Sequence, residues 1–136
     1  MFKLVKILNS GVNVAEPCHL KADKDNDYFV GTLIKQSYGI ATNVTATDKP
    51  THLVGENVGF GTKSHVLCHP ISPDMIFETT FAASPEGLKP GDKVTLAFDT
   101  TSATNVTATT TSGVAEIYDL VGAKNVGDRV YVRFPN

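Results

Sequence analysis

The chain has 136 residues, with 12 Lys and Arg against 14 Asp and Glu and a formal net charge of −2. This length predicts a single compact unit that needs neither a metal nor a disulfide to fold. With 41% hydrophobic and 19% charged residues, the composition excludes a disordered or membrane-spanning chain. The near-neutral charge argues against a nucleic-acid partner, which would require a basic face.

The N-terminal segment predicts synthesis in the cytoplasm. Its apolar run from Phe2 to Leu8 is interrupted by Lys6 and stops at Asn9, which is too short for a secretory signal. Cys18 and Cys68 are the only cysteines, and two thiols do not make a secreted disulfide framework. We therefore expect a reducing compartment and two free thiols.

Two Cys-His dipeptides are the candidate metal ligands. They are Cys18-His19 and Cys68-His69, and His65 stands three residues before the second one. Zinc accepts such donors, but adjacent residues of a strand point to opposite faces, so one dipeptide does not easily aim both side chains at one ion. No Cys-x-x-Cys pair is present. The sequence therefore favours structural cysteines, with no metal and no cofactor.

An acidic segment follows, with carboxylates at Asp23, Asp25 and Asp27. This spacing is that of a calcium loop, which also needs Gly at its sixth position and Glu at its twelfth. Tyr28 and Ile34 occupy those positions here. The segment is therefore predicted to be a solvated loop.

An internal repeat is the most informative feature. The sequence Ala-Thr-Asn-Val-Thr-Ala-Thr occurs at 41–47 and again at 103–109. Before each copy lies a predicted strand that begins near a glycine, Gly31 in the first half and Gly91 in the second. After each copy lies another predicted strand of this kind, which begins near Gly61 or Gly127. Repeats can fix an architecture. We interpret this one as a duplicated β module, 28–69 and 88–136, joined by a Pro-rich packed connector, 70–87.

Period-2 alternation predicts strands in the second half. Val94, Leu96 and Phe98 share one face of the first strand, as do Val130, Val132 and Phe134 of the last. The segment Lys89-Pro90-Gly91-Asp92 has the signature of a type II turn that leads into a strand. Because Thr and Val suit a pleated surface, the sequence predicts an all-β barrel or sandwich with little or no helix.

No catalytic constellation is predicted. Cys68 and His65 lie close in sequence, but they are separated by the strand-like Val66 and Leu67. The glycines of the run 54–61 match neither a dinucleotide-binding nor a Walker pattern. That run is predicted to be a loop that becomes ordered against a partner, and the protein is predicted not to be an enzyme.

The order of these elements resembles the small β-rich head decoration (cement) proteins of tailed bacteriophages. The resemblance rests on Gly-Thr-Leu-Ile at 31–34, the copy at 41–47, Lys-Pro-Thr-His-Leu-Val at 49–54 and the turn and strand at 88–94. It implies a structural virion protein on the capsid surface. Such a protein binds the major capsid protein, sits side by side with further copies of itself, and contacts neither nucleic acid nor membrane.

On this resemblance, the N-terminal strand and the two loops are the candidate contact surfaces. An extended segment can pair through its backbone with the sheet edge of a partner. The candidate residues are Phe2, Leu4, Asp23, Asp25, Asp27, Gly55, Glu56, Asn57, Gly59, Phe60 and Gly61. The alternative is a β-sandwich binding module of a phage tail or fibre that recognises protein or glycan. Sugar stacking favours Trp or Tyr, and this chain has no Trp and four Tyr.

Overall fold

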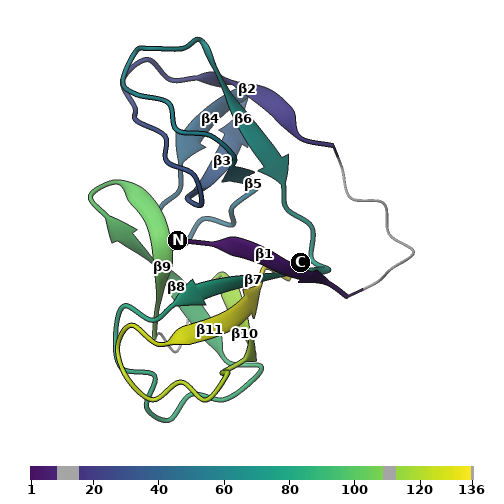
Figure 1. Cartoon of the computed structure of the whole chain (residues 1–136), viewed down its shortest axis with the longest axis vertical. Coiled ribbons are helices and arrows are strands. Elements are labelled where there is room, and N and C mark those ends of the chain that lie inside the picture. The colour runs from purple at the N-terminus through teal and green to yellow at the C-terminus, as the bar shows by residue number, and fades with distance from the viewer. Residues whose placement is uncertain (9–15, 109–112, 136) are drawn as a thin grey trace.

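The prediction of an all-β fold is confirmed. The computed structural model describes residues 1–8, 16–108 and 113–135, in which every regular element is a strand (Figure 1). The strands are β1 (Lys3–Ile7), β2 (Cys18–Ala22), β3 (Leu33–Ser37), β4 (Ile40–Asn43), β5 (His52–Val54), β6 (His65–Pro70), β7 (Met75–Thr80), β8 (Lys93–Asp99), β9 (Ser102–Ala108), β10 (Ala115–Asp119) and β11 (Arg129–Arg133). These described ranges contain no helix long and apolar enough to cross a membrane.

Strands β2 to β6 form a closed barrel, which we call the first barrel. Strand β3 pairs antiparallel with β4 and with β5, β5 pairs with β6, and β6 pairs with β2. The parallel pair of β2 and β4, with Lys21 opposite Ile40 and Ala22 opposite Ala41, closes the ring. Closure leaves no long sheet edge unpaired in this half of the molecule.

Strands β7 to β11 repeat this order in the second barrel, which occupies the lower half of Figure 1. Strand β8 pairs antiparallel with β9 and β10, β10 pairs with β11, and β11 pairs with β7. A single parallel bridge from Phe81 to Val106 links the end of β7 to β9. The Ala82 N–H donates to the Val106 carbonyl there at 2.7 Å.

The repeated sequence occupies the same place in both barrels. Each copy starts one residue into the second strand of a hairpin with a two-residue loop, Tyr38-Gly39 in one and Thr100-Thr101 in the other. Ala41 and Ala103 are both buried, and so are Val44 and Val106. Thr109 lies outside the described residues. The two copies therefore occupy equivalent positions in the two barrels.

The segment 70–87 differs from the expected connector. It contains β7, which pairs with β1 on one edge and with β11 on the other, so it belongs to the second barrel. Met75, Phe77 and Phe81 are all buried in its interior face. The shared parity of Met75, Phe77 and Phe81 predicts a strand here, but the prolines at the end of β6 and in the turn at 71–74 favour a connector over a strand of the second module. The first barrel likewise begins at β2, before residue 28.

The two barrels share a core at their junction. Leu33 and Val44 of the first barrel pack into the core of the second, together with the buried Phe2. Leu33 also pairs with Ala103 of β9, and the Phe2 N–H donates to the Gly31 carbonyl at 2.7 Å. The halves therefore form one body.

The alternation predicted for the C-terminal strand is present in full. Val130, Val132 and Phe134 are completely buried, and Phe134 packs against the rings of Phe2 and Phe77. In β8, Val94 and Leu96 are buried, but Phe98 is 36% exposed. Phe98 lies near the hairpin loop, where a bulge shifts the register with β9 and interrupts the regular alternation of side chains.

Candidate functional site

Two of the predicted contact loops lie side by side at one end of the first barrel. We call residues 23–30 and 55–61 the paired loops. Tyr28 and Val58 exchange two backbone hydrogen bonds, of 2.8 and 2.9 Å. Side chains add two more links, because Asn57 Oδ1 accepts from the Val30 N–H at 2.9 Å and Asp27 Oδ1 accepts from the Phe60 N–H at 2.6 Å. Sequence reasoning proposed both loops but not their contact.

A buried tyrosine fixes the paired loops to the barrel. The Tyr28 hydroxyl donates to the Ala41 carbonyl at 2.7 Å and accepts from the Asp23 N–H at 2.8 Å. Burial raises the pKa of Tyr28, so the hydroxyl stays protonated and remains a donor. Its ring and Val58 are part of the first-barrel core. The loops are therefore ordered before any partner binds.

Anchoring Tyr28 and Val58 inward leaves apolar neighbours facing solvent. Phe60 is 62% exposed, and Phe29 and Val30 are each close to half exposed. Asp25, Asp27 and Phe29 line a hollow of about 400 Å³ together with Thr100 and Thr101 at the tip of the β8–β9 hairpin. An apolar centre with a polar rim is the usual make-up of a protein–protein contact surface.

The remaining predicted loop residues support the loops rather than project from them. Glu56 accepts a hydrogen bond from the Leu67 N–H at 3.0 Å and pairs with Lys63 at 3.3 Å, and these contacts lower the pKa of its carboxyl. Gly55 is packed against the His69 ring, and the Gly59 carbonyl accepts from the Thr62 hydroxyl. Gly61 has a positive φ of 66°. Asp23 Oδ1 accepts a hydrogen bond from the Asp25 N–H at 3.0 Å.

The N-terminal strand has a different role from the one expected. Phe2 is only 2% exposed because its ring fills the second-barrel core, so it is not available to a partner. Leu4 is partly exposed, but β1 already pairs with β7 along one edge. A bulge after Leu4 and the charges of Lys3 and Lys6 are devices that discourage further pairing at an edge.

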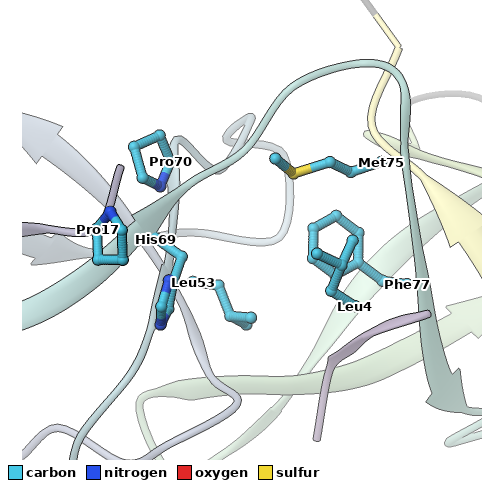
Figure 2. Close-up of a pocket in the computed structure, with 7 residues that line it drawn as sticks. All are labelled: Leu4, Pro17, Leu53, His69, Pro70, Met75 and Phe77. Carbon is cyan, nitrogen blue, oxygen red and sulfur yellow. The ribbon is translucent and has the colours of Figure 1, made fainter. Parts of the chain in front are cut away.

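An apolar pocket of about 380 Å³ lies between the barrels (Figure 2). Leu4, Met75 and Phe77 form one wall, and the other wall consists of Pro17, Leu53, His69 and Pro70. The shape and lining suit an apolar group, and His69 brings the only ionisable side chain of this lining. Sequence reasoning missed the pocket because five separate segments contribute to it.

The two cysteines lie opposite one another, but the candidate metal ligands do not form a cluster. Cys18 stands directly opposite Cys68 in the antiparallel pair of β2 and β6. Both thiols are free. Within the described parts of the chain, no three His, Cys, Asp or Glu side chains gather as a metal site would require.

These observations define the class of protein as an all-β double barrel that presents an ordered, partly apolar loop surface. Comparison with known proteins adds no identity to this description. No protein-family model matches the chain, and no curated protein matches it.

Proposed function

We propose that the protein is a non-catalytic structural protein of a tailed-bacteriophage virion. In this proposal it decorates the mature head by binding the lattice of the major capsid protein and stabilises that lattice. The observation that carries the proposal is the exposed apolar surface of Phe29, Val30 and Phe60, which is held on hydrogen-bonded loops. The sequence resemblance to head decoration proteins supplies the kind of partner.

Pre-ordering is what makes the paired loops suitable for attachment. A loop that is already held by backbone bridges and by Tyr28 loses little conformational entropy when it binds. Aromatic residues in the centre of a contact surface usually contribute most of its binding energy. Phe29 and Phe60 are therefore the proposed anchors.

Binding to a lattice allows many weak contacts to stabilise the shell together. A protein that binds the expanded lattice and not its precursor shifts the equilibrium toward the expanded state by mass action. Many copies on one shell act together, because detachment of the shell subunits would require many contacts to break. A net charge of −2 is compatible with a protein partner.

Cosedimentation with expanded heads that lack this protein tests the proposal. We expect the wild-type chain to sediment with the heads to saturation, and Phe60→Ser to bind about tenfold more weakly or worse. Val126→Ser is the matched control, because Val126 is also 62% exposed but lies in the loop between β10 and β11 of the second barrel. It should bind like the wild type.

The outcomes separate the function from the site. Wild-type protein that stays in the supernatant at saturating concentration contradicts head decoration, and sedimentation with purified tails instead would favour the tail or fibre alternative. If the wild type binds heads and Phe60→Ser binds equally well, attachment to heads stands but the paired loops are not the contact surface.

A further inference from the structure

The only two cysteines of the chain meet across one strand pair. Cys18 is opposite Cys68 in the antiparallel pair of β2 and β6, two residues along from Leu20 opposite Val66. Side chains directly opposite one another in such a pair lie on the same face of the sheet. That face is the interior of the first barrel, because Leu20, Val66 and Cys68 are all buried.

The register also fixes the backbone separation. The Ala22 N–H donates to the Ser64 carbonyl at 2.9 Å, so every second pair from there, including Cys18 with Cys68, is a hydrogen-bonded pair. Such pairs have Cα atoms about 5.5 Å apart, which is inside the range for disulfides. Their Cβ atoms must approach by up to about 1 Å. Cys18 is the first residue of β2, so it can move without disturbing another pair.

We propose that Cys18 and Cys68 form a reversible intramolecular disulfide, with a small-molecule disulfide such as oxidised glutathione as the oxidant. The Cys18 thiolate attacks one sulfur of the glutathione disulfide, a mixed disulfide forms at Cys18, and one glutathione thiolate leaves. The Cys68 thiolate then attacks Cys18 Sγ and expels the second glutathione. The protein loses two electrons and two protons, and glutathione disulfide becomes two glutathione thiols.

Burial sets the order of the two steps. Cys18 is half-buried and reachable, whereas Cys68 is fully enclosed. Burial raises the pKa of Cys68 to about 12, with smaller contributions from nearby Cys18 and Glu56. Cys18 is therefore the attacking thiol, and closure by Cys68 is the slower step. A bond formed at a slightly wide separation is easily reduced again.

Intact-mass spectrometry of the reduced, folded chain incubated with oxidised glutathione tests the proposal. We expect a transient species heavier by one glutathionyl group, followed by a final species lighter than the starting chain by two hydrogen atoms. Peptide mapping should join Cys18 to Cys68, and the melting temperature should rise by several degrees because a 50-residue separation is now cross-linked.

Two variants make each step visible. Cys68→Ala should stop at the mixed disulfide, whereas Cys18→Ser should stay unmodified while folded. A wild-type chain that stops at the mixed disulfide, takes up two glutathionyl groups, forms disulfide-linked dimers or remains unmodified would overturn the proposal. The wild-type result is decisive by itself if a variant does not fold.

Discussion

The two barrels share one strand order but differ in how their interiors are filled. The second barrel has a large apolar core that includes Phe77, Phe81 and Phe134. The first barrel has a smaller core, in which the hydroxyl of the buried Tyr28 makes two hydrogen bonds. The same topology therefore encloses several aromatic rings in one half, and in the other a smaller apolar cluster with one buried polar contact. The half with the smaller core is also the one that presents the paired loops.

The largest effect is expected from truncating the second-barrel core. Phe77 is fully buried on β7, which pairs with both β1 and β11, and its ring packs against Phe134. Phe77→Ala should lower the free energy of unfolding by about 3–5 kcal/mol, measured by chemical denaturation. A loss below about 1 kcal/mol would show that this core is not what stabilises the second barrel.

A smaller loss is expected when the first barrel loses one hydroxyl. Tyr28→Phe keeps the ring but leaves the Ala41 carbonyl and the Asp23 N–H without their partner. The free energy of unfolding should fall by about 1–3 kcal/mol. Tyr131→Phe in the half-buried part of β11 is the control and should change it by less than about 0.5 kcal/mol. Equal losses in the two variants would remove the contrast between the barrels.

Two glycines, one in each barrel, differ in how much room a side chain would have. A Cβ at Gly113 would lie 2.5 Å from the Val94 backbone nitrogen, whereas one at Gly55 would meet the movable His69 ring at 2.7 Å. Gly113→Ala should therefore cost about 1–3 kcal/mol of unfolding free energy. Gly55→Ala should cost less, because a side chain can rotate away. The reverse order, measured by thermal or chemical denaturation, would contradict this packing.

The smallest effect is a pH dependence located in the first barrel. Burial lowers the pKa of His52, which is 8% exposed and has its Nδ1 2.8 Å from the Thr51 hydroxyl. The unfolded chain then binds the proton more readily, so stability is complete above the ordinary His pKa of about 6.5 and falls as the pH drops below it. In His52→Gln, the free energy of unfolding should depend less on pH between about pH 7 and pH 5 than it does in the wild type. An unchanged slope would exclude His52 as its source.

Most of the strands, and part of the similarity between the two barrels, could be predicted from the sequence. Alternation at Val130, Val132 and Phe134 identified a strand with a buried face, and the repeat marked equivalent hairpins. Alternation specifies a face but not a partner, so it could not reveal the parallel closure of each barrel. It also could not show that the strand within the expected connector pairs with β1 and β11.

The candidate site was predictable in its residues but not in its arrangement. Glycine and aspartate content indicates the loops at 23–27 and 55–61, because these residues favour turns. From the sequence, Tyr28 is a residue that disrupts a calcium pattern and one of four tyrosines available for sugar stacking, yet in the structure it anchors both loops. The sequence predicts Phe2 at a contact surface, because a strand at the chain terminus is expected to be exposed. Only the long-range contact with Phe134 shows that Phe2 belongs to the core.

Hydrogen–deuterium exchange of the chain bound to expanded heads tests the proposed attachment most directly. If the paired loops hold the protein on the shell, backbone amides of residues 26–30 and 57–61 should gain the strongest protection on binding. The outer strands of the second barrel should exchange as they do in the free chain. Protection confined to the second barrel, with the paired loops unchanged, would contradict the assignment.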